Sequence, residues 1–141
     1  MALNRIIILL GLLFCFPVFA HTETDCASAF TTLEINDCLN DQLQGKRDIM
    51  QQYLVAAKKR YSDETKVISA IDAGQSAWEA YKTSHCDSIY TLWMGGTIRV
   101  AMTLSCQINL TEARTHEIWS SYLTYMDDSP AILPEPEKPA D

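Results

Sequence analysis

The stretch that decides the fold runs from Cys86 to Cys106 and reads CDSIYTLWMGGTIRVAMTLSC. A cysteine stands at each end, and the glycine pair Gly95–Gly96 stands at the middle. Adjacent glycines are a strong local signal for a turn. If two helices reverse direction there, the two sulfurs come opposite each other across the hairpin. The stretch therefore predicts two antiparallel helices joined by a Cys86–Cys106 disulfide.

Apolar residues at helical spacing extend this hairpin in both directions. The helix expected before the turn starts after residues 62–65, and one of its faces carries Ile68, Ile71, Gln75, Trp78, Tyr81 and His85. The helix expected after the turn starts near Thr97 and carries Leu104, Ile108, Ile118, Trp119 and Tyr122.

A further amphipathic helix is predicted upstream of the hairpin. Thr31 and Glu34 fit a capping box, in which each side chain bonds the other residue's backbone N–H. The apolar stripe that follows consists of Leu39, Leu43, Met50, Leu54, Ala57 and Tyr61. Gly45 interrupts the stripe and suggests a kink or weak turn. Because no strand pattern occurs, we expect an all-α bundle of three to four helices.

The remaining cysteines indicate a second cross-link. Four cysteines follow residue 20, and four in a small exported domain are typical of two disulfides. Residue 32 lies midway between Cys26 and Cys38, next to the expected helix start, where the chain changes direction. We therefore favour the pairs Cys26–Cys38 and Cys86–Cys106 over the other two connectivities.

The first 20 residues have the pattern of a signal peptide. Arg5 precedes an apolar run that ends at Ala20, and the run is too short to span a bilayer. We expect a periplasmic or secreted protein with no stable membrane anchor after cleavage. A competing interpretation makes Cys15 a lipid anchor, but bulky Phe14 stands where such sites require a small residue.

Composition divides the rest of the chain into residues 21–126, the helical domain, and residues 127–141, a tail. The tail is acidic and rich in proline, so it is expected to be disordered. The whole chain carries 11 Lys and Arg against 18 Asp and Glu, a net charge of −7. This surplus argues against binding to nucleic acid or anionic lipid and allows a basic protein partner.

A family resemblance rests on the residues of the hairpin. Gln75, Trp78, Tyr81 and Lys82, with Cys86 four positions later, are similar to the Gln-x-x-Trp-x-x-Tyr-(Arg/Lys) signature of the lysozyme-inhibitor LprI-like family. Further matching elements are Thr32-x-Glu34-x-x-x-Cys38, Tyr53, Gly95-Gly96-Thr97, Cys106 and Leu110–Arg114. The resemblance covers roughly residues 26 to 120.

The resemblance implies an exported, disulfide-bonded helical protein, some of whose relatives inhibit lysozyme and none of which is expected to be an enzyme. One stretch of the first helix departs from the family pattern: Lys46, Ile49 and Met50 stand where an Asp-x-x-Leu-Asn run is usual. The alternative function is a structural or accessory protein of the bacterial envelope that inhibits no lysozyme.

The candidate partner-binding residues are those of the expected turn: Trp93, Met94, Gly95, Gly96, Thr97 and Arg99. One interpretation makes them only the connection that lets the two cysteines meet. The sharper one makes the loop a wedge that occludes a lysozyme cleft, with Asp87 and Glu79 as the acidic residues likeliest to flank it. Aromatic and Arg side chains are frequent anchors of such interfaces.

The other chemical candidates are expected to be structural. Gln75, Trp78 and Tyr81 are predicted to pack in the core, against the alternative of an exposed aromatic patch. We expect no cofactor and no metal site, although the amine and imidazole of His21 are chelating groups that could hold copper. His85 is expected to be partly buried and His116 exposed. No catalytic residues are expected, because disulfides use all four remaining cysteines and no paired carboxylates stand out.

Overall fold

The computed structural model describes residues 25–138, which form one short 3-10 turn and three long helices. The turn η1 is Cys26–Ser28, and the helices are α1, Thr32–Arg60, α2, Thr65–Leu92, and α3, Arg99–Tyr122. No strand occurs within residues 25–138, so the predicted all-α class is confirmed with three helices. The expected signal peptide and Cys15 lie outside the described residues.

The start of α1 is fixed by the predicted capping box. The Thr31 Oγ1 accepts the backbone N–H of Glu34 at 3.2 Å, and the Glu34 carboxylate accepts the backbone N–H of Thr31 at 2.9 Å. The same carboxylate oxygen also accepts the N–H of Phe30. These backbone bonds hold the pKa of Glu34 below its ordinary value. From there α1 stays helical through Gly45, so the weak turn considered at that residue does not occur.

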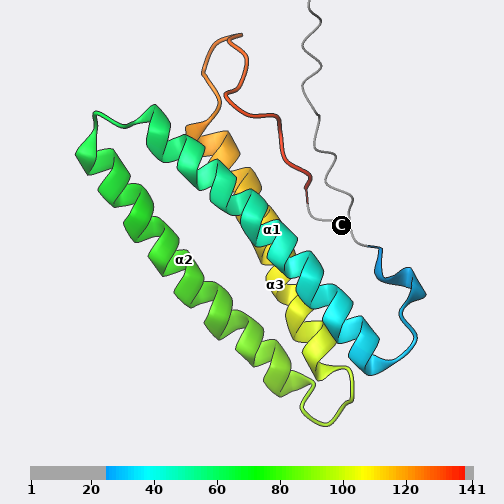
Figure 1. Ribbon diagram of the computed structural model, residues 1–141. Coiled ribbons are helices and arrows are strands. Elements are labelled where there is room, and N and C mark those ends of the chain that lie inside the picture. The colour runs from blue at the N-terminus through cyan, green and yellow to red at the C-terminus, as the bar shows by residue number, and fades with distance from the viewer. Residues whose placement is uncertain (1–24, 139–141) are drawn as a thin grey trace, which may run out of the picture.

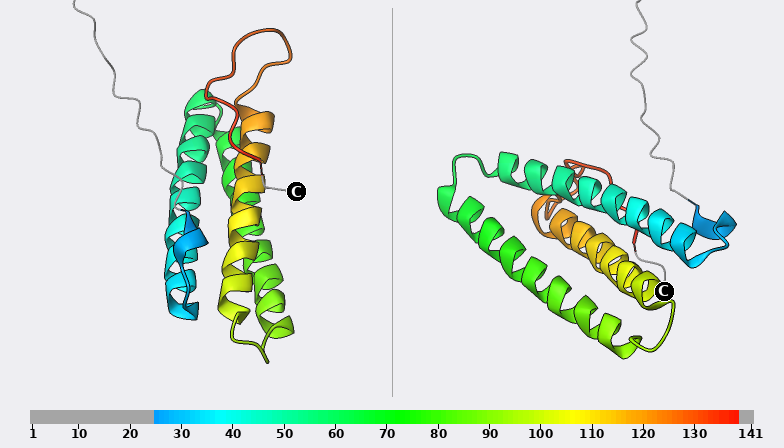
Figure 2. Two further views of the ribbon diagram at one scale, coloured as in Figure 1. Left: turned by 90° about the vertical axis from the view of Figure 1, so that its right-hand side faces the viewer. Right: turned by 60° about the horizontal axis from the view of Figure 1, so that its bottom comes forward.

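The three helices are arranged with α3 in the middle. Both α1 and α2 pack on α3, and α1 and α2 diverge from the short turn that joins them (Figures 1 and 2). The hydrophobic core lies toward that turn and consists of Met50, Tyr53, Leu54, Ala57, Ile71, Ile118 and Leu123. Five of these residues come from the three predicted stripes: Met50, Leu54 and Ala57 from the first, Ile71 from the second and Ile118 from the third.

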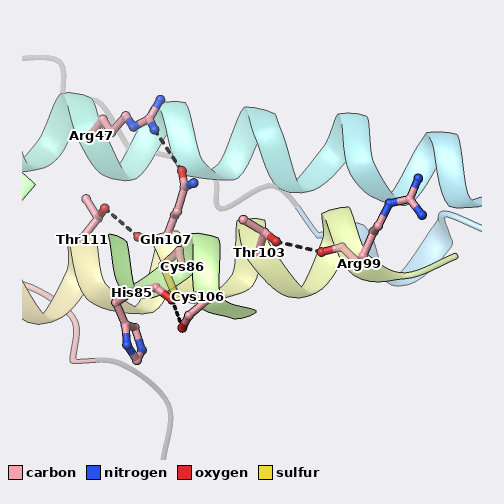
Figure 3. The surroundings of a disulfide bond; sticks show 9 residues. Arg47, His85, Cys86, Arg99, Thr103, Cys106, Gln107 and Thr111 are labelled. Atoms are coloured by element: carbon pink, nitrogen blue, oxygen red, sulfur yellow. Dashed lines mark hydrogen bonds between the residues drawn. A yellow bond between two sulfur atoms is a disulfide. The ribbon is translucent and has the colours of Figure 1, made fainter. Parts of the chain in front are cut away.

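Both predicted disulfides are present. Cys26 pairs with Cys38 and Cys86 pairs with Cys106, with a Cα–Cα distance of 5.8 Å in each. The second bond lies between α2 and α3, and Cys86 is completely buried (Figure 3). Next to it, Arg47 of α1 donates a 3.1 Å hydrogen bond to the side chain of Gln107.

Part of the predicted tail, residues 127–138, lies within the described residues and contacts the bundle near Leu133 and Pro134. This stretch contains no helix or strand, yet its backbone carbonyls accept hydrogen bonds from two aromatic side chains of the bundle. Trp119 Nε1 donates to the Leu133 carbonyl at 2.9 Å, and the Tyr53 hydroxyl donates to the Pro134 carbonyl at 2.8 Å. Leu133 also packs against the core. We call residues 131–138 the C-terminal strap; the tail cannot order itself, but the bundle orders it.

Acid is expected to loosen this strap. His116 and Lys138 hydrogen-bond Glu135 and hold the pKa of its carboxyl below the ordinary value of 4.5. A carboxyl whose pKa is lowered by folding stabilises the fold above its ordinary pKa, and that contribution is lost as the pH falls through the lowered value. The NMR signal of the Trp119 indole N–H should therefore shift as the pH falls below about 4.5. Glu135→Gln should remove this step, and an unmoved Trp119 signal down to pH 3 would refute the contact's role.

Candidate partner-binding surface

The turn between α2 and α3 is held by its own backbone. Trp93 donates its N–H to the carbonyl of Ile89 at 3.1 Å, and Gly96 donates to the carbonyl of Trp93 at 2.8 Å. Arg99 closes the loop from the other side, because its guanidinium donates a 3.2 Å hydrogen bond to the Met94 carbonyl. The same guanidinium lies over the Tyr90 ring, 5.7 Å from its centroid. Arg99 therefore braces the loop and is half-buried by doing so.

The glycine pair is not required by the backbone of this turn. Neither Gly95 nor Gly96 has a positive φ. A Cβ on Gly95 would meet nothing within 4 Å, and one on Gly96 would meet the Trp93 carbonyl at 3.5 Å, an ordinary contact. The predicted turn is confirmed, but its glycines leave space rather than relieve strain. A Cβ fits at either position without distorting the backbone.

The loop presents apolar side chains to solvent. Met94 is 57% exposed, and its neighbour Leu92, the last residue of α2, is 75% exposed. Trp93 and Ile98 are exposed to a lesser extent. The residues predicted for partner binding thus lie together on the surface at one end of the bundle, and all but the half-buried Gly96 and Arg99 are exposed.

A hollow separates this loop from the first turns of α1. It is lined by Thr32, Asn36, Gly95, Gly96, Thr97, Arg99 and Val100. Within it, the buried side-chain oxygen of Asn36 has no hydrogen-bond partner among the described residues. The start of α1 and the α2–α3 turn therefore lie at the same end of the bundle (Figures 1 and 2). Sequence reasoning missed this neighbour, because the two segments are about 60 residues apart in the chain.

The signature residues Gln75 and Trp78 connect α2 to α3. Arg114 Nε donates a 3.1 Å hydrogen bond to the side-chain oxygen of Gln75, and the Arg114 guanidinium lies 6.0 Å from the Trp78 ring centroid. Gln75 in turn donates to the Glu79 carboxylate at 3.2 Å. Arg114 is 9% exposed, so this network lies inside the helix interface. Gln75 and Trp78 are half-buried.

The predicted burial of Tyr81 is wrong. Its side chain is 54% exposed and stacks on the exposed ring of His85, with the ring centroids 5.5 Å apart. The buried residue is Lys82, only 4% exposed, whose ammonium lies 2.6 Å from the Glu79 carboxylate and 4.6 Å from the Trp78 ring centroid. Residues three positions apart do not lie directly above each other on a helix with 3.6 residues per turn, so Tyr81 lies at the edge of the face that carries Trp78. A long lysine stem packs as an apolar group when its charged end finds a partner.

The two carboxylates expected to flank the loop are placed differently. Glu79 lies fourteen residues before Trp93 in the same helix and on the order of 20 Å away. It pairs with the buried Lys82, and at this distance it cannot contribute to the loop surface. Asp87 is exposed on α2, directly after Cys86 and nearer the loop.

Residues 25–138 contain neither a free thiol nor a cluster of metal ligands. All four cysteines there are in disulfides, so none is a thiol nucleophile. No group of three or more His, Cys, Asp or Glu side chains in this range is placed to hold a metal ion. His21 lies outside the described residues, and His116 instead contacts Glu135 of the strap at 3.0 Å. No helix in this range is long and apolar enough to cross a bilayer.

Comparison with known proteins identifies the family. Residues 24–118 match the family model described as "Lysozyme inhibitor LprI", which is more than half of the chain. No curated protein matches the sequence, and no solved structure matches it.

Proposed function

Because the chain belongs to the lysozyme inhibitor LprI family, we propose that it is an exported protein that inhibits a lysozyme by placing the Trp93–Arg99 loop in the enzyme's cleft. Inhibition would be steric: the loop occupies the space of the glycan substrate, and no bond is made or broken. The exposed position of this loop is the observation that carries the proposal.

The construction of the loop supports this role. A loop that is already ordered loses little conformational freedom on docking, so more of the contact energy appears as affinity. The bonds from Gly96 to Trp93 and from Arg99 to Met94 supply that order before any partner arrives. Exposed Trp93 and Met94 supply apolar contact area, and aromatic side chains are frequent hot spots of interfaces. The acidic surplus of the chain would attract a basic lysozyme and raise the association rate.

The test is a turbidity assay on a cell-wall substrate with several lysozyme types in parallel. Oxidised protein should inhibit at least one type with a one-to-one stoichiometry. Failure with every type would favour the alternative, an envelope accessory protein that inhibits no lysozyme.

Gly96→Trp is expected to abolish inhibition and leave the helical circular dichroism spectrum unchanged. The backbone accepts a Cβ at Gly96, and the bulk of an indole at this position of the loop should prevent its entry into a cleft. Gly45→Trp is the matched control, because a Cβ there meets nothing within 4 Å and the position lies in the middle of α1. It should inhibit like the original protein. Full inhibition by Gly96→Trp would remove the loop from the mechanism.

Arg99→Glu should abolish inhibition as well, since it removes the bond that holds the Met94 carbonyl. Lys59→Glu makes the same charge change on an exposed residue near the far end of α1 and serves as its control. Equal inhibition by these two variants would show that the Arg99 brace is not needed.

A further inference from the structure

The segment before α1 is fixed in place although it contributes nothing to the core. We call residues 26–33 the N-terminal hook. Its turn η1 contains no buried residue, Phe30 is 90% exposed and Leu33 is 69% exposed. Yet the Cys26–Cys38 disulfide ties it to α1, and the Glu34 carboxylate accepts the N–H groups of both Phe30 and Thr31. Burial of apolar surface therefore does not explain why the hook is ordered.

The position of Phe30 makes its exposure unusual. Phe30 directly precedes the N-cap Thr31, and an apolar residue there commonly packs against the fourth residue of the helix, here Ile35. At 90% exposure, Phe30 does not make this contact. Its ring is held by the backbone around it and is free to contact another molecule. Leu33 is the second residue of α1, and its side chain is likewise free to contact another molecule.

The hook adjoins the loop already proposed to bind a lysozyme. The hollow next to Gly95 and Gly96 has Thr32 and Asn36 of α1 as its other wall. The exposed apolar side chains of this end are Phe30, Leu33, Leu92, Trp93, Met94 and Ile98. They come from two segments that lie at one end of the bundle (Figures 1 and 2). Several large apolar side chains exposed at one end of a molecule are typical of an interaction site.

Charge indicates the kind of partner. Residues 25–45 contain no Lys, Arg or His, and their acidic residues Asp25, Glu34, Asp37 and Asp41 are all exposed. Leu33 and Asp37 are four residues apart and share a face of α1. Across the hollow, Arg99 is the one basic residue of the loop, and its guanidinium is engaged with Met94 and Tyr90. An apolar centre with an acidic rim is complementary to a basic protein.

We infer that the N-terminal hook and the Trp93–Arg99 loop form one composite docking surface for a basic lysozyme, with Phe30 and Leu33 as its second pair of anchors. The Cys26–Cys38 disulfide then serves binding, because it holds the hook in the orientation that the partner meets. The Cys86–Cys106 disulfide serves the fold. This inference rests on the proposed function and assigns it a second contact region.

The first test replaces the two apolar anchors. Phe30→Ser combined with Leu33→Ser should weaken inhibition at least about tenfold, the loss expected for hot-spot residues. The thermal midpoint should stay the same, since both side chains are exposed. Val55→Ser is the matched control, because Val55 is 53% exposed on α1 and lies more than five turns beyond Leu33. It should inhibit like the original protein.

The second test removes the cross-link of the hook. Cys26→Ser combined with Cys38→Ser should weaken inhibition to a similar degree and lower the thermal midpoint by only a few degrees. Without the disulfide, the hook gains conformational entropy in the folded protein as well as in the unfolded one. The two gains largely cancel in the free energy of unfolding. A drop of the midpoint comparable with that caused by losing Cys86–Cys106 would overturn the inference, because the hook would then be a structural element.

The outcomes separate the inference from the proposed function. If Gly96→Trp loses inhibition while both hook variants inhibit at full strength, the loop acts alone, and the composite surface is overturned while the function stands. If the original protein inhibits no lysozyme, both are overturned. Loss of inhibition in the hook variants with normal midpoints, and full inhibition by Val55→Ser, is the result that supports the composite surface.

Discussion

Replacing Cys86 and Cys106 with alanine together is expected to lower the free energy of unfolding by roughly 3 kcal/mol, the value of the chain-entropy model for a loop of this length. The bond joins α2 to α3 across a sequence separation of 20, and Cys86 is completely buried. Without the bond, the unfolded chain gains conformational entropy. Alanine also leaves a gap where the two sulfurs packed. A typical small domain has only about 5–15 kcal/mol of stability, so the change should be evident.

Urea unfolding followed by circular dichroism measures this effect, with the Cys26→Ser and Cys38→Ser double variant as the comparison. The two disulfides close loops of similar size, so chain entropy alone predicts nearly equal losses. Their surroundings predict unequal ones, because Cys86–Cys106 lies within the bundle and Cys26–Cys38 holds a turn that buries no residue. Equal losses would contradict the division of roles between them.

Arg114→Ala should lower the free energy of unfolding by about 2–4 kcal/mol, since removing one partner of a buried charged network leaves the others without compensation. Arg114 is 9% exposed, donates to the Gln75 side chain, and lies against the Trp78 ring. Alanine would leave the Gln75 oxygen without its donor and open space beside the indole. The same urea measurement applies.

Glu117→Ala is the control for Arg114→Ala. Glu117 forms an ion pair with Arg114 at 2.9 Å, but the Glu117 side chain is 61% exposed. Exposed ion pairs contribute about 1 kcal/mol or less to stability. If Arg114→Ala costs no more than Glu117→Ala, the buried network is not a source of stability. The signature residues Gln75 and Trp78 would then need another explanation than the one given by their contacts.

These contacts assign most of the family signature to the fold rather than to the binding surface. Gln75 and Trp78 connect α2 to α3 through Arg114, and Lys82 contacts Glu79 and Trp78 within α2. The residues proposed to meet a lysozyme lie instead in the turn and in the hook. A relative could therefore keep the signature and the bundle and lose inhibition by changes in either segment.

The sequence by itself determined the features that depend on local spacing. The hairpin at Gly95–Gly96, the capping box at Thr31 and both disulfide pairings follow from residues close together in the chain. In each case the partners are brought together by a single helix start or a single turn. Helical periodicity likewise identified most of the core, because a stripe of apolar residues has to face its neighbours.

Only the tertiary structure decided the features that depend on which helices are neighbours. Lys82 is buried because it lies on the side of α2 that packs on α3. Tyr81 is exposed because it lies on the side that α3 does not cover. The strap is ordered because Tyr53 and Trp119, from two different helices, present donors to consecutive carbonyls. The start of α1 and the loop line one hollow because the bundle brings both to the same end. Composition and periodicity describe each segment alone, whereas these contacts join segments that are distant in the chain.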